Sequence, residues 1–209
     1  MIIDFTHIID NGITAYTEDT KPKIKQIATI DNDHYEERSI NIFTHTGTHI
    51  DSPRHMLKEG KYIDEYKLDD LIGTAVIIDL SHIKEKEITK IDLLIYNEEI
   101  NKAEFVLIKT GWEKYWCMEE YFNNYPTLTI EAAEYLASFK LKGVGVDCIS
   151  IGKAEDEITL HKIFLEKDIL IVENLSLKEK IEGIFKLIIA PLKIKNSDGV
   201  PVRAFGIMF

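Results

Sequence analysis

The chain has 209 residues, of which 45% are hydrophobic and 29% are charged, and its formal net charge is −11. These proportions are typical of globular proteins and exclude a disordered chain, and the acidic charge excludes nucleic acid and anionic membrane surfaces as partners, because both require a basic face. The length is sufficient for a sizeable core, and no linker-like cluster interrupts it, so the sequence predicts one domain over residues 1–209.

The first residues, MIIDFTHIIDN, favour a cytoplasmic location. They include Asp4 and Asp10 and have neither a basic start nor an apolar run, so they do not resemble a secretion signal. The longest apolar stretches in the chain fall far short of the ~20 residues that a membrane-spanning helix needs. The two cysteines, Cys117 and Cys148, form no CxxC pair and are expected to be reduced packing residues.

The stretch Phe43–Met56, FTHTGTHIDSPRHM, concentrates residues that bind metals, namely His45, His49, Asp51 and His55. A regular helix would turn Asp51 away from the histidines, because residues two apart do not face each other. A regular strand, at ~3.3 Å per residue, would place His45 and His49 about 13 Å apart, too far for one ion. A single such histidine is more often a surface or hydrogen-bonded core group, but this clustering favours a metal site.

A bend at Gly47 would bring these donors together. Glycine permits backbone angles that are closed to other residues, and Pro53 discourages a helix through the segment. Two imidazoles and a carboxylate suit a divalent transition metal, typically zinc or manganese. Three protein ligands leave a coordination position for water, so the pattern indicates a catalytic metal rather than a structural zinc site.

Short β-branched runs separated by helical patterns make up the rest of the chain. The predicted strands are Thr74–Leu80, Phe105–Lys109, Gly143–Ile149, Ile169–Val172, Lys186–Ala190 and Val202–Phe209. The predicted helices run from Thr129 as N-cap to Gly143, from Thr159 to Lys167, and, on a weaker pattern, over Trp112–Tyr121. This alternation predicts an α/β protein, and the less regular first seventy residues are expected to add antiparallel strands to a mixed sheet.

Several polar and aromatic residues outside the cluster have more than one interpretation. From its spacing alone, His161 is a surface residue of a helix. Glu173 directly follows a buried strand, where an unpaired carboxylate is costly, so a counter-charge such as a metal ion is expected beside it. Four others suit either a role at the site or a purely structural one: Tyr16, Trp112, Asp147 and Ser150.

The segment HTGTHIDSPRH, from His45 to His55, resembles the HxGTHxDxPxH signature of the cyclase family, which includes bacterial kynurenine formamidases and isatin hydrolases. Every defined position of that signature is matched. The resemblance covers nearly the whole chain, through DFTHIIDNGITAY, KTGW, GVGVDCISIG, LHKIFLEKDILIVENL and PLKIKNSDGVPVRAFGI. It implies a swivelling β/β/α-type fold, in which a mixed, barrel-like sheet is surrounded by helices.

The resemblance also implies a dinuclear metal centre, commonly of zinc, although some relatives hold a single manganese or another ion. Carried over position by position, two ligand sets share one aspartate: His45, His49 and Asp51 for one ion, and Asp51, His161 and Glu173 for the other. His55 would stand beside the centre, unligated, as the group that transfers protons. Relatives are commonly dimers or tetramers, so a homodimer or homotetramer is expected.

The function that the resemblance implies is metal-dependent hydrolysis of a small-molecule amide, with N-formylkynurenine, cleaved to kynurenine and formate, as the leading substrate. A metal-bound hydroxide would attack the carbonyl, and His55 would act as general acid and base. One alternative is a cyclic-amide hydrolase of the isatin type, and another is a metal-binding protein without catalysis. No serine lies in a GxSxG elbow, so the sequence does not support an acyl-enzyme mechanism.

Overall fold

The structure, a computed structural model, describes residues 1–13, 15–83 and 87–208. The strands of its main sheet are β1 (Ile2–Asp4), β4 (His49–Asp51), β5 (Ile72–Asp79), β7 (Phe105–Lys109), β9 (Gly143–Val146), β10 (Leu170–Glu173), β11 (Phe185–Pro191) and β12 (Gly199–Ile207). Within the described residues, seven strands close into a ring in the order β12–β11–β5–β7–β9–β10–β4, because β4 pairs back onto β12. The predicted α/β class with a barrel-like sheet is confirmed.

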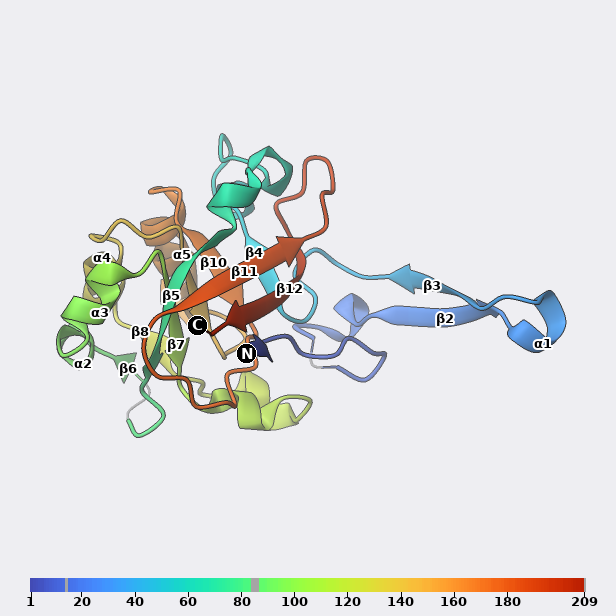
Figure 1. The fold of residues 1–209 in the computed structure, drawn as a ribbon, viewed down its shortest axis with the longest axis horizontal. Helices are drawn as coiled ribbons and strands as arrows, with labels where there is room; N and C mark the ends of the chain where they lie inside the picture. Colours follow the sequence, from blue (N-terminus) through green and yellow to red (C-terminus); the bar gives the residue numbers. More distant parts are fainter. Residues whose placement is uncertain (14, 84–86, 209) are drawn as a thin grey trace.

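The sheet is mixed, and its parallel part carries the helices. Strands β5, β7, β9 and β10 are parallel neighbours, whereas β4, β11, β12 and β1 run antiparallel to the strands they pair with. Parallel strands need crossover connections, which contain α2 (Lys90–Leu94), α3 (Asn97–Lys102), α4 (Ile130–Leu136) and α5 (Glu157–Leu165). These four helices cover one side of the barrel (Figure 1).

Side chains of the central strands alternate between two buried layers. In β7, Phe105 and Leu107 pack with the residues that fill the barrel, whereas Val106 and Ile108 pack with those beneath the helices. Because both faces of β7 are buried, its sequence, FVLIK, has a continuous apolar run rather than alternating apolar and polar residues. The barrel is therefore a packed core.

The smaller elements lie outside the main sheet. The strands β2 (Lys23–Ala28) and β3 (Glu37–Asn41) form a separate antiparallel hairpin through α1 (Ile30–Asp33), and β6 (Glu87–Ile88) pairs with β8 (Thr127–Leu128). The antiparallel strands that the first seventy residues were expected to add to the mixed sheet are β1 and β4, whereas this hairpin forms a sheet of its own. The short 3-10 helices are η1 (Glu18–Thr20), η2 (Pro53–His55), η3 (Ile63–Glu65), η4 (Leu68–Asp70), η5 (Trp112–Tyr115), η6 (Glu119–Phe122) and η7 (Ala154–Asp156).

Most predicted strands are confirmed to within two residues, but β9 ends at Val146 rather than Ile149 and β12 begins at Gly199 rather than Val202. Phe209 lies outside the described residues. The helix predicted over Trp112–Tyr121 is wrong, because Cys117 has a left-handed backbone (φ 66°) and divides the segment into η5 and η6. The helix after Thr129 is shorter than predicted and ends at Leu136, and Gly143 begins β9.

The two cysteines differ in their surroundings. Cys148 is buried, as expected of a packing residue, but Cys117 is exposed, so the prediction is wrong for that position. Among the described residues, no helix combines the length and the apolar character needed to cross a bilayer.

The N-cap of α4 gives a test of the fold at the level of one side chain. The Thr129 hydroxyl accepts a hydrogen bond from the Ala132 N–H at 3.2 Å. Replacing Thr129 by Ala leaves that N–H unsatisfied, so we expect the free energy of unfolding to fall by about 1 kcal/mol in urea denaturation. Thr129→Ser retains the hydroxyl and should unfold as the wild type does. Equal losses in both variants would show that packing, rather than capping, matters at this position.

Candidate metal centre

The site forms where β4 lies between β10 and β12. In this register His49 is directly opposite Glu173, and Asp51 is opposite Gly199 of β12. Alternate residues of a strand share one face, and directly paired residues of neighbouring strands lie on the same face. The register therefore points His49, Asp51 and Glu173 into the same space.

A fourth side chain enters this space from α5. His161 Nε2 lies 3.4 Å from Glu173 Oε1 and 3.8 Å from Asp51 Oδ2. His49 Nε2 lies 3.4 Å from Asp51 Oδ1 and 3.5 Å from Glu173 Oε2. All four side chains are buried, and we call them the inner cluster: His49, Asp51, His161 and Glu173.

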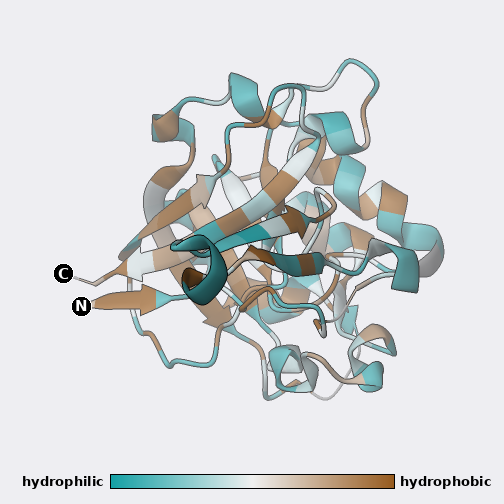
Figure 2. Cartoon of the chain, turned by 90° about the vertical axis from the view of Figure 1, so that its right-hand side faces the viewer, coloured by the Kyte–Doolittle hydropathy of each residue, from teal (hydrophilic) through white to brown (hydrophobic). Residues whose placement is uncertain are grey.

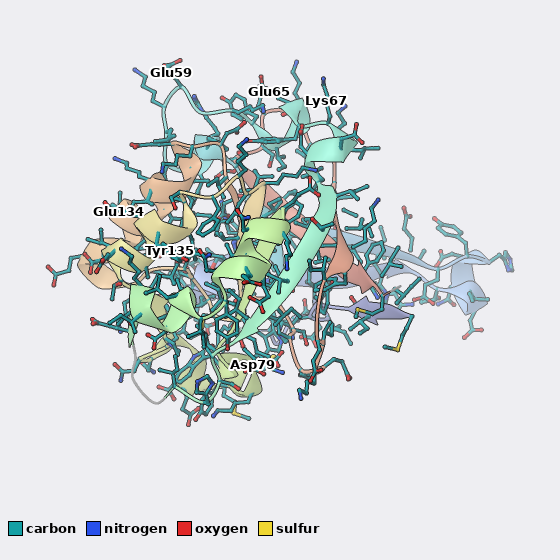
Figure 3. The ribbon with its side chains drawn as sticks, turned by 60° about the vertical axis from the view of Figure 1, so that its left-hand side comes forward. Glu59, Glu65, Lys67, Asp79, Glu134 and Tyr135 are labelled. Carbon is teal, nitrogen blue, oxygen red and sulfur yellow. The ribbon has the colours of Figure 1, made fainter. Side chains whose placement is uncertain are left out.

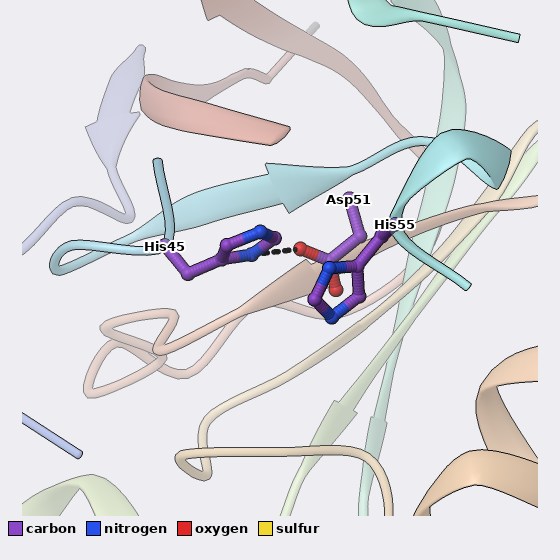
Figure 4. Close-up of side chains that lie close together, drawn as sticks. All are labelled: His45, Asp51 and His55. Carbon is purple, nitrogen blue, oxygen red and sulfur yellow. Dashed lines mark hydrogen bonds and ion pairs between the residues drawn. The ribbon is translucent and has the colours of Figure 1, made fainter. Parts of the chain in front are cut away.

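A second, more exposed group shares Asp51 with the inner cluster. His45 Nδ1 lies 2.7 Å from Asp51 Oδ1, and His55 stands next to the pair, with its ring centroid 4.1 Å from that of His45 (Figure 4). Asp198 Oδ2 lies 3.0 Å from His45 Nε2 and 3.4 Å from His55 Nδ1. We call these residues the outer cluster: His45, Asp51, His55 and Asp198.

Two glycines make room for His45. Gly47 has a φ of +64°, so the bend predicted from the sequence is confirmed, and it lets the chain turn from His45 into β4. Gly199 lies beneath the imidazole ring, where a Cβ would come within 2.7 Å of His45 Cε1. The absence of a side chain at Gly199 therefore helps to define the position of this ring.

Backbone carbonyls fix the orientation of two imidazoles. His49 Nδ1 lies 2.8 Å from the Gly47 carbonyl oxygen, and His161 Nδ1 lies 2.7 Å from that of Glu157. A carbonyl oxygen only accepts, so each Nδ1 carries the hydrogen, and in the neutral ring each Nε2 offers its lone pair to the inner cluster. Such hydrogen bonds behind the ring are usual for histidines that bind metals.

The cluster holds its carboxylates in the ionised form. Burial opposes ionisation of Asp51, but the neighbouring His45 and His49 hold its pKa below the usual value. Burial likewise opposes ionisation of Glu173, whereas its hydrogen bonds with His161 and His49 hold its pKa well below the ordinary range. The carboxylates also affect the imidazole. Burial disfavours the charged form of His45, but Asp51 and Asp198 raise its pKa to about 10.

One atom of the cluster has no hydrogen-bond partner. Asp51 Oδ2 is buried and accepts no hydrogen bond from the part of the chain that the structure describes, which is costly for an ionised oxygen unless a cation lies beside it. Imidazole nitrogens and carboxylate oxygens together are the donors that zinc and manganese take in proteins. The residues of the site therefore fit a divalent metal ion.

The donor atoms fall into two overlapping sets. Among the described residues, atoms of His45, Asp51 and His55 lie within 4.8 Å of one another, and so do atoms of His49, Asp51 and Glu173. The resemblance instead groups His45 with His49 and leaves His55 unligated. Asp51 belongs to both sets in the structure and to both sets implied by the resemblance. The assignment of the other side chains as ligands stays a prediction.

A cavity of about 300 Å³ opens above the two clusters, which is small enough to select a metabolite-sized ligand. Tyr16, Phe43 and Ile149 give it apolar walls, and Ser150 adds a hydroxyl. Trp112, the other aromatic residue considered for a pocket, is not among the lining residues; it is buried, and its Nε1 donates to the Tyr121 carbonyl at 2.9 Å.

Asp147 has a structural role in a turn. Its carboxylate accepts hydrogen bonds from the backbone N–H groups of Thr110 and Gly111 at 2.7–3.0 Å. Burial opposes ionisation of this group and raises its pKa, although these hydrogen bonds act in the opposite direction. Of the two interpretations of Asp147, the structure thus supports the structural one.

Asp198 was missed in the sequence analysis. It precedes β12, and Ser52 holds its carbonyl oxygen through two hydrogen bonds, from N at 3.0 Å and from Oγ at 2.9 Å. Its only sequence signal is the Asp198–Gly199 pair, which is ordinarily a turn signal. Nothing in the spacing places residue 198 beside residues 45 and 55, because only the pairing of β12 with β4 does so.

Asn174 was also missed. Its Nδ2 donates to the Gly47 carbonyl at 3.0 Å, and its Oδ1 accepts from the Tyr121 hydroxyl at 2.8 Å. It directly follows Glu173 and has a left-handed backbone, with φ 57°. The residue therefore ties the bend at Gly47 to the end of β10, and so holds the two sides of the inner cluster together.

The chain matches a known protein family. Residues 3–153 match the family described as "Putative cyclase". The chain is 30% identical over 211 residues to the kynurenine formamidase of Bacillus thuringiensis (strain Al Hakam), with 97% of this chain and 95% of that relative covered.

Solved structures are similar as well. A potential metal-dependent hydrolase with cyclase activity is 30% identical, with a TM-score of 0.84 and coverage of 99% of this chain and 96% of the other. An isatin hydrolase bound to the product analogue thioisatinate is 25% identical, with a TM-score of 0.86 and coverage of 99% and 92%.

The Tyr121–Asn174 hydrogen bond can be tested by removing one hydroxyl. Tyr121 is fully buried, so Tyr121→Phe leaves Asn174 Oδ1 without its partner. We expect the free energy of unfolding to fall by about 1–3 kcal/mol in urea denaturation.

Tyr135 provides the matched control, because its hydroxyl makes the same kind of bond, to Asn97 Oδ1 at 2.8 Å, on the solvent-facing side of α4 (Figure 3). There water replaces the lost partner, so Tyr135→Phe should change stability by less than about 0.5 kcal/mol. A loss in Tyr121→Phe no larger than in this control would contradict the role given to the buried bond.

Proposed function

This chain belongs to the cyclase family, as its resemblance predicted, and we propose that it is an arylformamidase, which hydrolyses N-formylkynurenine to kynurenine and formate. The observation that carries the proposal is the buried Asp51 carboxylate shared by two groups of imidazoles at the floor of a small cavity. Similarity to a kynurenine formamidase over 97% of the chain supports the choice of substrate. The cytoplasmic location and the single domain stay predictions.

The proposed metal ligands are those predicted from the resemblance, with Asp51 shared: His45, His49, Asp51, His161 and Glu173. Zinc is the proposed ion, at one or two per subunit, and manganese suits the same donors. When bound, a divalent ion polarises the substrate carbonyl and lowers the pKa of water, so that water becomes a nucleophile near neutral pH.

The remaining chemistry is proton transfer, which falls to His55. Hydrolysis adds water across the C–N bond: the carbon receives the oxygen, and the nitrogen leaves with one of the protons. The Asp198 carboxylate faces His55 Nδ1 and so favours the tautomer with its hydrogen on that atom. This leaves Nε2 to take a proton from water and return it to the leaving nitrogen.

The cavity walls orient the substrate. Tyr16 and Phe43 offer aromatic surface near the mouth, on which the ring of an aryl amide can stack, while the carbonyl points to the floor. Excluding water around the ring strengthens the electrostatic interactions of the donors below it.

A second candidate is hydrolysis of a cyclic amide of the isatin type. The observation that favours it is the structural likeness to an isatin hydrolase bound to a product analogue, over 99% of this chain. Both reactions open a C–N bond next to an aromatic ring, so the same donors and the same proton transfers would serve either one.

Purified protein incubated separately with N-formylkynurenine and isatin, and followed by ultraviolet absorbance, decides between the candidates. We expect rapid turnover of N-formylkynurenine, loss of turnover after treatment with a chelator, and recovery when zinc or manganese is returned. Turnover of isatin alone would establish the second candidate. A protein that binds the metal but turns over neither amide would be a metal-binding protein without this catalysis.

The roles of His55 and Asp51 can be separated by measuring metal content and turnover together. We expect His55→Ala to retain its metal but lose turnover by about 10²–10⁴-fold, the usual contribution of general acid–base catalysis. Asp51→Ala should lose both, because it removes the carboxylate common to the two clusters. Equal metal loss in the two variants, measured by elemental analysis, would refute the division of roles.

A further inference from the structure

One acidic side chain of the cavity wall has no partner in the described part of the chain. Glu157, the first residue of α5, lines the cavity and is half-buried. Within residues 1–13, 15–83 and 87–208, no group donates a hydrogen bond to its carboxylate or forms an ion pair with it. By contrast, Glu173, the other carboxylate of the wall, faces His49 and His161. The charge of Glu157 is therefore left for a ligand to balance.

The helix directs the Glu157 carboxylate along the cavity wall. Glu157 lies four residues before His161, so the two side chains share one face of α5, with Cβ atoms about 5–6 Å apart. Side chains of a helix lean toward its N-terminus, and that direction leads away from His161. A neighbouring hydroxyl agrees with this placement, because burial and then the charges of Glu157 and Glu173 raise the pKa of Tyr125. The carboxylate thus lies about one helical turn from the inner cluster.

The backbone that carries Glu157 is held in place by close packing. A Cβ at Gly152 would come within 2.8 Å of the Glu157 Cα, so the two segments touch. The Gly152 carbonyl accepts a hydrogen bond from the Tyr125 hydroxyl at 2.8 Å, and the Glu157 carbonyl oxygen lies 2.7 Å from His161 Nδ1. A ligand that binds the carboxylate therefore pays little to order the backbone beneath it.

An acidic residue at this end of a helix also stabilises the helix dipole. Two other acidic residues, Glu155 and Asp156, stand at the same end and are exposed to solvent. They interact with the dipole as well, so this interaction does not require a further carboxylate in the cavity wall. The position of Glu157 points instead to a ligand.

The chemistry of that ligand follows from the charges of the wall. Among the described residues, the lining includes no lysine or arginine. Glu157 also belongs to neither of the two donor sets for a metal ion. The histidines of the lining all face other carboxylates: His45, His49, His55 and His161. A carboxylate in a partly enclosed site is stabilised by a cation, and an ammonium group is a compact cation with three hydrogen-bond donors.

We propose that Glu157 is a specificity-determining residue, which binds the ammonium group of a substrate that carries an amine on a short chain beside its aromatic ring. The inference rests on the proposed function and deepens it, because N-formylkynurenine has such an ammonium group whereas isatin has none. The segments at the base of the β2–β3 hairpin, which points toward the viewer in Figure 2, supply Tyr16 and Phe43, on which the ring stacks. The ammonium group then meets Glu157 while the amide carbonyl lies over the clusters.

Two formamides that differ in one group test this role. The first is N-formylkynurenine, and the second is its analogue in which hydrogen replaces the ammonium group, so that the ring, ketone, carboxylate and formamide are retained. Glu157→Gln removes the charge but keeps the size of the side chain and the backbone carbonyl that orients His161. We expect it to raise KM for N-formylkynurenine by about 10–100-fold and to leave KM for the analogue unchanged, because only the first substrate loses a charge-assisted hydrogen bond.

Asp156→Asn is the matched control. It removes the same charge from the same end of α5, at an exposed position outside the cavity lining, and should leave KM unchanged for both formamides. A rise in KM for both substrates in Glu157→Gln would show a structural role, and an unchanged KM for both would show no contact with the substrate. Either result would overturn the proposal. Elemental analysis and circular dichroism check that both variants retain their metal and their fold.

Binding measured without turnover separates this inference from the proposed function. Kynurenine and its counterpart without the ammonium group are titrated into the metal-containing protein, and Kd is measured by calorimetry. We expect the wild type to bind kynurenine at least about 10-fold more tightly than the counterpart, and Glu157→Gln to bind the two equally. Equal binding of the two by the wild type, or binding of neither, would overturn the role of Glu157. A protein that shows the preference but hydrolyses neither formamide would refute the proposed function alone.

Discussion

The site depends on the register in which β4 is held between β10 and β12. A slip of one residue would turn every side chain of β4 to the opposite face, so that His49 and Asp51 would no longer meet Glu173. Pairing on both edges of β4 makes such a slip costly, since two ladders of hydrogen bonds would have to be remade. Closure of the barrel through β4 therefore defines the geometry of the metal donors.

The same closure buries charge that must be balanced. Two carboxylates and two imidazoles of the inner cluster are almost completely removed from water, and each is stable there because it lies within 4 Å of an oppositely ionisable group. The Gly47 and Glu157 carbonyls then fix the rings, so that the nitrogen lone pairs converge on Asp51 and Glu173. The arrangement that balances these buried charges is thus also the one that would present the donors to a metal ion.

The sequence predicts this site only as far as its candidate ligands are close together in the chain. His45, His49 and Asp51 could be recognised because one bend within seven residues brings them together, and Gly47 supplies a visible reason for that bend. Spacing alone gave His161 as a surface residue, although it is buried, because the packing of α5 against the sheet leaves no local signal. The position of Asp198 beside His45 and His55 depends on the pairing of β12 with β4, which are far apart in the sequence. The projection of the β2–β3 hairpin likewise depends on which strands the rest of the chain pairs with, so neither feature can be predicted from a short stretch of sequence.

The barrel holds the proposed donor atoms, whereas the segments on either side of the β2–β3 hairpin (the arm) form part of the cavity wall. The proposed metal ligands and His55 come from β4, η2, α5, β10 and the turn before β4, whereas the aromatic side chains at the mouth, Tyr16 and Phe43, lie on the segments that flank the arm. A change in those segments would reshape the cavity without moving a donor atom. The chain is similar both to a protein named kynurenine formamidase and to an isatin hydrolase, and one fold can host different functions. Under the proposed function, the segments that flank the β2–β3 hairpin are therefore one place where selectivity between the two amides would arise.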